Sequence, residues 1–136
     1  MITEEYVSFE TAKLLKEKGF DGECSRFYMP SGHGRWKYEH YHDFDKSDRI
    51  DCPIQQMAMR WLREVHYLFI SIFTFDYQFD SYGWMFLIKP LRYVEGVGWC
   101  WNSDCVQEKK WSNDKVYKIY EDAVDAAIKY CLENLI

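Results

Sequence analysis

The feature that most constrains this chain is a nearly unbroken apolar run from Tyr67 to Phe75. The run is far shorter than the roughly 18 apolar residues that a membrane-spanning helix requires. Large side chains occupy both alternating faces: Tyr67, Phe69, Phe73 and Phe75 on one, and Leu68, Ile70 and Ile72 on the other. Because the even positions become polar only later, we predict a long strand over 67–79 whose first half is central and covered by helices.

The residues after this strand predict its antiparallel partner. Residues 80–83 form a hairpin loop in this interpretation, and the chain returns over 84–94. Pro90 lacks an amide hydrogen, so it indicates an edge or a bulge late in the returning strand.

Two earlier strands are predicted over 24–29 and 35–44, separated by a turn-forming segment at 30–34. The second of these alternates strictly. One of its faces carries five aromatic or imidazole side chains: Trp36, Tyr38, His40, His42 and Phe44.

A first helix is predicted over 8–18. Ser8 is an N-cap residue, because its hydroxyl can accept from an amide of the first turn. Gly19 occupies the position after the helix where a left-handed residue belongs, and Phe20 can close back onto Leu15 in a Schellman motif.

A second helix is predicted over 51–66, with Asp51 as its cap and Pro53 in its first turn. Its apolar stripe recurs at helical spacing: Ile54, Met57, Ala58, Trp61 and Val65. His66 falls at the C-terminus, where a protonated imidazole would meet the negative end of the helix dipole.

A third helix is predicted over 120–134. Acidic residues occupy its first turn, as the helix dipole favours. Its apolar stripe consists of Tyr120, Val124, Ala127, Ile128, Cys131 and Leu135.

The element order is therefore α-β-β-α-β-β-α. Hairpin-connected strands with helices between them predict an α+β fold in a single domain, residues 1–136, with an antiparallel sheet of about four strands packed by helices. Residues 95–114 interrupt the pattern with glycines, tryptophans and cysteines. A loop of this length is unusual in a compact domain, so the segment either contains a short hairpin or is functional.

Composition limits the classes of partner and compartment. The formal net charge of the 136 residues is −5, and no basic face is visible, so nucleic-acid binding is not expected. The N-terminal residues lack a secretory signal, and five cysteines follow no framework spacing. These features predict a cytoplasmic protein with reduced thiols and without a membrane segment.

Three stretches resemble a group of small phage-related or hypothetical proteins from gut anaerobes. They are SFETAKLLKEKGFD at 8–21, PIQQMAMRWLREVH at 53–66 and YEDAVDAAIKYCLENLI at 120–136, and they coincide with the predicted helices. The resemblance implies a cytoplasmic accessory protein of a phage or mobile element. No catalytic residue comes with it.

Metal binding is the first candidate chemistry. Potential ligands gather before the second helix: His33, His40, His42, Asp43 and Asp45. The two strand histidines share their face with aromatic residues, so we interpret them as covering the sheet. Cys100 and Cys105 have no second close pair to complete a tetrahedral site. The glycine segments at 32–34 and 96–98 precede no helix, so they are not phosphate-binding loops, and we expect no metal and no cofactor.

A cysteine nucleophile is the second candidate. Cys52 lies at the start of the second predicted helix, where the dipole could lower the thiol pKa. No histidine follows His66, so a catalytic base would come from the upstream histidines. A small residue beside a helix cap is the simpler interpretation.

Aromatic side chains outside the periodic elements are the remaining candidates. Trp61, Phe69 and Phe73 lie where periodicity predicts burial. Five others lie at the hairpin end or in 95–114, and these are our candidate binding residues: Tyr82, Trp84, Trp99, Trp101 and Trp111. They form either anchors for a protein partner or a satellite core beneath the long loop.

The leading hypothesis is a non-enzymatic binding or regulatory protein that engages a protein partner. The alternative is a small cysteine- or metal-dependent hydrolase. Single-stranded nucleic-acid binding is a third class that the net charge weakens, and the oligomeric state stays open.

Overall fold

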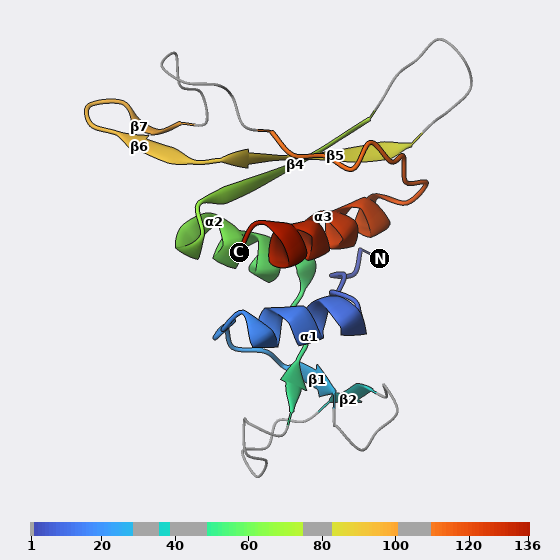
Figure 1. Cartoon of the computed structure of the whole chain (residues 1–136). Coiled ribbons are helices and arrows are strands. Elements are labelled where there is room, and N and C mark those ends of the chain that lie inside the picture. Colours follow the sequence, from blue (N-terminus) through green and yellow to red (C-terminus); the bar gives the residue numbers. More distant parts are fainter. Residues whose placement is uncertain (1, 29–35, 39–48, 75–82, 101–109) are drawn as a thin grey trace.

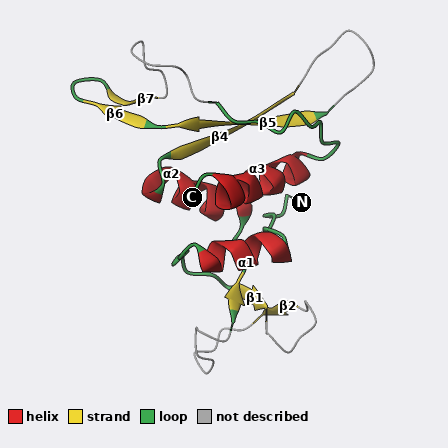
Figure 2. Cartoon of the chain, in the orientation of Figure 1, coloured by secondary structure: helices red, strands yellow, loops and turns green. Residues whose placement is uncertain are grey.

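The computed structural model describes residues 2–28, 36–38, 49–74, 83–100 and 110–136. These residues form an α+β structure, as predicted (Figure 2). The helices are α1 (Phe9–Glu17), α2 (Gln55–Val65) and α3 (Tyr120–Asn134). The strands are β1 (Arg26–Tyr28), β2 (Trp36–Tyr38), β3 (Ile50–Asp51), β4 (Leu68–Thr74), β5 (Trp84–Pro90), β6 (Arg92–Val94) and β7 (Gly98–Cys100). No helix within these ranges is both long and apolar enough to cross a membrane.

The first helix confirms its predicted ends. The Ser8 side chain accepts a hydrogen bond from the Thr11 amide, as an N-cap does. At the other end, Gly19 has a φ of 86°, and the Phe20 amide donates to the Leu15 carbonyl at 2.9 Å. These contacts complete the predicted Schellman closure.

The second helix begins later than predicted, and the Asp51 cap is wrong. Asp51 ends β3, where it pairs with Phe27, and the helix begins at Gln55. Ile54 takes the N-cap position without a side-chain bond, while the Gln55 amide donates to the Glu5 carbonyl at 2.8 Å. The N-terminal segment therefore satisfies the first of the helix amides that have no partner within the helix.

The third helix confirms the predicted range 120–134. Its buried side chains are Ala123, Val124, Ala127, Ile128, Cys131 and Leu132. They pack with α2, β4 and β5 around Leu62, Ile70, Phe86 and Ile88, all buried. Each such aliphatic or aromatic side chain stabilises the fold by about 1.5–3 kcal/mol through its removal from water.

The prediction of one antiparallel sheet of about four strands is wrong for the described residues. They form three small antiparallel sheets with strand orders β2-β1-β3, β4-β5 and β6-β7. Figure 1 shows the reason: the helices separate the β1-β2-β3 sheet from the β4-β5 sheet, so the two cannot pair. From one end of the molecule to the other, the layers are β4-β5, then α2 with α3, then α1, then β1-β2-β3.

The β5 strand is interrupted where Pro90 indicated an irregularity. β5 ends at Pro90 and β6 begins at Arg92. The next strand, β7, pairs with β6, so the start of the segment 95–114 supplies the turn and the second strand of a short hairpin whose first strand precedes it. After it, Trp111 and Tyr117 form isolated antiparallel bridges to Ile88 and Trp84 on β5. The segment after the hairpin therefore adds an irregular third strand beside β5.

β4 has one buried face, not two. Leu68 and Ile70 face the helices and are buried, whereas Phe69 on the opposite face is 38% exposed. The predicted burial of Phe69 is therefore wrong, and Phe73 is only half-buried, while Trp61 is buried as predicted. The described helices cover a single side of the β4-β5 sheet (Figure 1).

Candidate functional site

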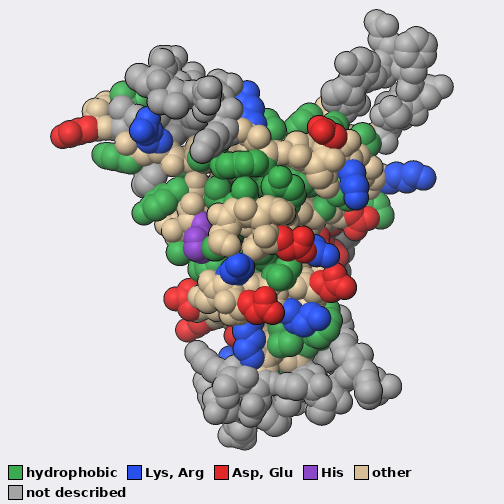
Figure 3. Space-filling view, viewed as in Figure 1, with side chains coloured by type: hydrophobic (Ala, Val, Ile, Leu, Met, Phe, Trp, Pro, Cys, Tyr) green, Lys and Arg blue, Asp and Glu red, His purple; other side chains and the backbone are tan. Residues whose placement is uncertain are grey.

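Exposed apolar side chains gather where α2 passes into β4 and where the β6-β7 hairpin lies. The residues concerned are Val65 (51% exposed), Tyr67 (48%), Tyr93 (60%) and Val97 (75%), which we call the apolar end. The Leu91 amide donates to the Tyr67 carbonyl at 2.7 Å, which joins the helix-to-strand junction to the start of the hairpin strand. Figure 3 shows hydrophobic side chains on this side of the molecule.

Sequence reasoning missed this surface. Val65 belongs to the apolar stripe of the second helix and was therefore predicted to be buried, yet it lies in the last turn and is exposed. Tyr67 follows the helix, and its alternation with Leu68 resembled a strand covered on both faces. The only signal in the sequence was an excess of apolar residues beyond what one covered face requires.

Tyr67 has an unusual backbone conformation. Its φ of 57° places it in the left-handed region, which costs an L-residue with a Cβ roughly 1–2 kcal/mol. Glycine normally occupies this position after a helix. Tyr67 therefore holds a half-exposed aromatic ring at a strained backbone position.

The predicted binding residues have different positions. Tyr82 and Trp101 lie outside the described residues. Trp99 is in β7, where its backbone pairs with that of Tyr93 in the apolar end. Trp99 is therefore the predicted binding residue whose backbone the structure places next to the apolar end.

The other two predicted residues belong to β5 and its neighbouring segment. The ring of Trp84 contacts that of Tyr120 at 5.0 Å between centroids, in an edge-to-face arrangement. Trp111 packs against the core as a partly buried side chain and bridges Ile88. Both positions agree with the satellite-core interpretation of these two tryptophans.

Cys52 lies in a setting that disfavours a nucleophile. It precedes α2 by three positions, and its thiol donates to the Val7 carbonyl at 3.2 Å. It is completely buried, and desolvation raises the pKa of its thiol well above the ordinary range. The lowered pKa that a helix terminus could have produced is therefore absent, and burial agrees with the simpler interpretation of Cys52 as a structural residue.

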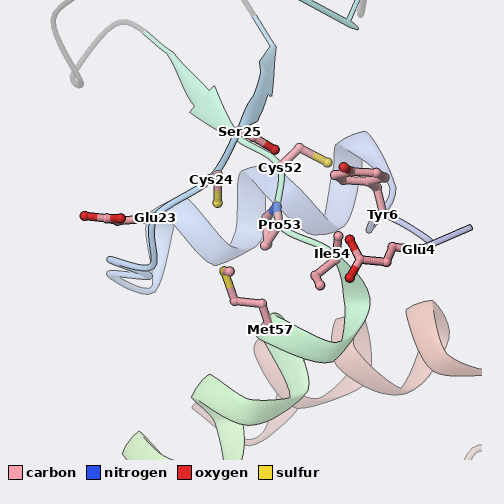
Figure 4. A pocket seen from close by; sticks show the side chains of 9 residues that line it. All are labelled: Glu4, Tyr6, Glu23, Cys24, Ser25, Cys52, Pro53, Ile54 and Met57. Carbon is pink, nitrogen blue, oxygen red and sulfur yellow. The ribbon is translucent and has the colours of Figure 1, made fainter. Parts of the chain in front are cut away.

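A pocket beside Cys52 has a volume of about 390 Å³ and is lined by Glu4, Tyr6, Glu23, Cys24, Ser25, Cys52, Pro53, Ile54 and Met57. Figure 4 shows the Cys24 and Cys52 thiols pointing in different directions. Desolvation is also the main cause that raises the pKa of Cys24, to about 12. A thiol with so high a pKa carries almost no thiolate at neutral pH, so this pocket lacks an activated nucleophile.

A second, larger pocket of about 590 Å³ is acidic. Its lining includes Glu4, Glu5, Glu121, Asp122 and Asp125. The Asp125 carboxylate is already bonded to α1: it accepts from the Ser8 amide and hydroxyl, both at 2.8 Å, and from the Thr11 hydroxyl at 3.0 Å. This carboxylate has a structural role, because it joins α3 to the first turn of α1.

Most of the candidate metal ligands lie outside the described ranges: His33, His40, His42, Asp43, Asp45 and Cys105. Within them, no group of three or more His, Cys, Asp or Glu side chains is arranged to hold a metal ion.

His66 does not form the charged cap that the sequence predicted. Its ring contacts Trp61 edge-on at 4.6 Å, and burial lowers the pKa of its imidazole. The neutral form is therefore favoured.

Comparison of the chain with protein-family models, with curated proteins and with solved structures found no match. Functional inference therefore rests on the geometry of the apolar end and on the chemistry of the described pockets.

Proposed function

We propose that this chain is a non-enzymatic binding protein that engages a protein partner through the apolar end. The observation that carries the proposal is that Val65, Tyr67, Tyr93 and Val97 are exposed on two segments, the α2-to-β4 junction and the β6-β7 hairpin, which the hydrogen bond from the Leu91 amide to the Tyr67 carbonyl joins. Single exposed apolar residues are ordinary, whereas a group of them on a soluble protein marks an interaction surface.

The composition of the apolar end suits a protein partner. It offers two tyrosines, a residue type that supplies large contact area at low entropic cost. Exposed Arg92 and Glu95 flank the hairpin residues and provide a polar rim. The strained backbone of Tyr67 supports the same conclusion, because the fold retains an aromatic ring where glycine is easier.

Localisation and origin are part of the same proposal. The resemblance of the three helical segments to phage-related proteins supports an accessory protein of a phage or mobile element. The scattered cysteines and the net charge of −5 support a reducing, cytoplasmic setting and a partner other than nucleic acid.

The proposal predicts that a partner cross-links to the apolar end. A benzophenone-bearing amino acid in place of Tyr93 should capture one defined protein after irradiation of the producing cells. The matched control replaces Ile119, which is similarly exposed at 54% but lies before α3. The captured protein is then purified and its affinity measured by calorimetry.

The double variant Tyr93→Ser with Val97→Ser should weaken that affinity at least about tenfold, or 1.4 kcal/mol, because both anchors are lost. The control pair Val116→Ser with Ile119→Ser removes as many exposed apolar side chains elsewhere and should bind like the unmodified protein. Equal cross-linking from both positions, or unchanged affinity of the first variant, would refute the proposal.

A further inference from the structure

β4 has an open edge. Within the described ranges it pairs only with β5. β5, in contrast, is bonded on both sides, because its other edge exchanges backbone hydrogen bonds with Trp111 and Tyr117. The sheet can therefore be extended at β4 and not at β5.

The pairing phase shows which backbone groups face the open edge. Ile88 and Trp111 exchange both backbone hydrogen bonds, at 2.9 and 3.0 Å. The N–H and C=O groups of the even residues of β5 therefore point away from β4. The odd residues of β5 bond β4, and the register pairs them with odd residues such as Phe69. The even residues of β4 therefore direct their N–H and C=O groups to the open edge: Leu68, Ile70, Ile72 and Thr74.

The sequence of β4 lacks the residues by which proteins usually prevent unwanted pairing at an edge. Edge strands typically carry lysine, proline or a bulge. From Tyr67 to Phe75 there is no charged residue, no glycine and no proline. The seven residues of β4 also pair continuously with β5, without a bulge. An edge of this kind is expected to have an occupant.

The sequence of the edge is self-complementary. Residues 69–73 read Phe-Ile-Ser-Ile-Phe, the same in both directions, with Ser71 at the centre. In an antiparallel pair of two copies related by a two-fold axis at Ser71, each residue meets its own kind. Phe69 lies opposite Phe73, and Ile70 lies opposite Ile72.

We propose that β4 pairs with β4 of a second copy of this chain, antiparallel and centred on Ser71. The hydrogen-bond phase agrees with this register, because Ile70 lies opposite Ile72 and Leu68 lies opposite Thr74. These are the even residues whose backbone groups point outward. Ser71 and the phenylalanines then form non-hydrogen-bonded pairs, in which side chains approach most closely. Aromatic cross-strand pairs stabilise a sheet by about 0.2–1 kcal/mol each.

The two-fold arrangement joins two β4-β5 sheets into one continuous antiparallel sheet. Charge does not oppose it at the contact, since the paired strands carry none. A strand of this length buries on the order of 400 Å² per chain, about half of a standard interface. A contact of this size belongs to the small class of interfaces, so the dimer should be weak and reversible.

This inference rests on the edge of β4 and not on the apolar end. Ser71 lies in the middle of the strand, and none of the tests below changes Val65, Tyr67, Tyr93 or Val97. Failure of either proposal therefore leaves the other intact.

Sedimentation velocity over about 5 to 500 µM protein tests the dimer. The unmodified chain should pass from monomer to dimer. Ser71→Lys should remain monomeric, because it places two like charges directly opposite at the axis. Ser71→Thr should retain the dimer. Leu87→Lys is the matched control: it adds the same charge to the same face, on β5, opposite Ser71 within one chain, and should also dimerise.

Oxidative cross-linking tests the register. In a non-hydrogen-bonded pair the two Cα atoms are about 4.5 Å apart, within the range of a disulfide. Ser71→Cys should therefore give a disulfide-linked dimer on a non-reducing gel, above the level of the unmodified chain. Phe69→Cys should not, because position 69 faces position 73 of the other copy. The five native cysteines are common to both variants.

Circular dichroism and thermal melting establish that each variant is folded. A monomer at every concentration overturns the inference. A dimer that survives Ser71→Lys, or is lost equally with Leu87→Lys, indicates a different interface and overturns it as well. Equal cross-linking of Ser71→Cys and Phe69→Cys overturns the register.

Discussion

Single residues with local partners behave as their sequence context predicts. Ser8 bonds the Thr11 amide and Gly19 adopts a left-handed conformation, because capping involves groups within one helical turn. Residues whose partners are distant in sequence do not behave as their sequence context predicts. The sequence placed His66 at the negative end of the α2 dipole and offered a similar effect for Cys52 as a candidate, yet burial dominates the pKa shifts of both residues.

His66 provides a prediction about pH at this scale. Burial lowers the pKa of its imidazole below the ordinary 6.5. As pH falls through 6.5, the unfolded chain therefore binds a proton that the folded chain does not. The stability contributed by His66 is present above that pH and is lost as pH falls toward the folded pKa. Between pH 7 and 5, the free energy of unfolding of the unmodified protein should decrease more than that of His66→Phe. Urea titration at each pH measures both values.

The Phe variant retains a ring against Trp61, so the comparison isolates the titrating group. A pH-independent difference between the two proteins would contradict the prediction. A gain in relative stability of the unmodified protein at low pH would instead support a charged imidazole at the helix C-terminus.

Elements differ in how well the sequence predicts them. The range of α3 is confirmed, because its stripe and its polar face are both clear over 120–134. The predicted start of α2 is wrong, since Asp51 pairs with β1 as part of β3 and the helix begins at Gln55. The sequence predicted β4 correctly as a strand, but it did not predict correctly which of its faces are covered. A strand apolar on both faces has the same sequence pattern whether its second face meets a helix or another molecule.

The junction between α2 and β4 supports a test of backbone strain. Tyr67→Gly and Tyr67→Ala both remove the ring, but only glycine adopts a φ of 57° without strain. The free energy of unfolding of the glycine variant should therefore be about 1 kcal/mol higher than that of the alanine variant. Guanidinium titration measures the difference.

Equal stability of these two variants, or greater stability of the alanine variant, would show that Tyr67 is not strained. Under the proposed function, both variants should also bind the protein partner more weakly than the unmodified chain does. The loss of binding follows from the missing ring and not from the backbone.

At the scale of the whole molecule, the layers are held together by contacts between residues far apart in sequence. Asp125 of α3 accepts three hydrogen bonds from Ser8 and Thr11, more than a hundred positions away. Lys129 of α3 adds a surface ion pair with Glu10 at 2.9 Å, which contributes little in water. The attachment of α1 to α3 therefore depends more on the Asp125 carboxylate.

Asp125→Ala should lower the free energy of unfolding by about 2–3 kcal/mol, because it removes charge-assisted hydrogen bonds and frees a capping serine. Asp122→Ala is the control. It removes an exposed carboxylate from the first turn of the same helix and should cost only about 0.5 kcal/mol. Comparable losses in the two variants by urea titration would refute the role of Asp125.

The candidate site was only partly predictable. The segment 95–114 was identified as irregular, and its first residues form the turn and second strand of the β6-β7 hairpin and contribute Val97 to the apolar end. Trp84 and Trp111 instead pack against the protein, because β5 brings each beside α3 or the core. Aromatic content indicates which residues are large; only packing determines which of them remain exposed.

By itself, the sequence determined the α+β class, the capping of α1, the range of α3, the hairpin of β4 with β5 and the break beside Pro90. These depend on periodicity and on backbone chemistry between near neighbours. The tertiary structure decided that the thiol of Cys52 is buried and that, among the residues it describes, three small sheets form and β4 has an open edge and an exposed face. The physical reason is that burial and strand pairing depend on which distant segments arrive at a surface, and the alternation of a strand is the same whether or not they do.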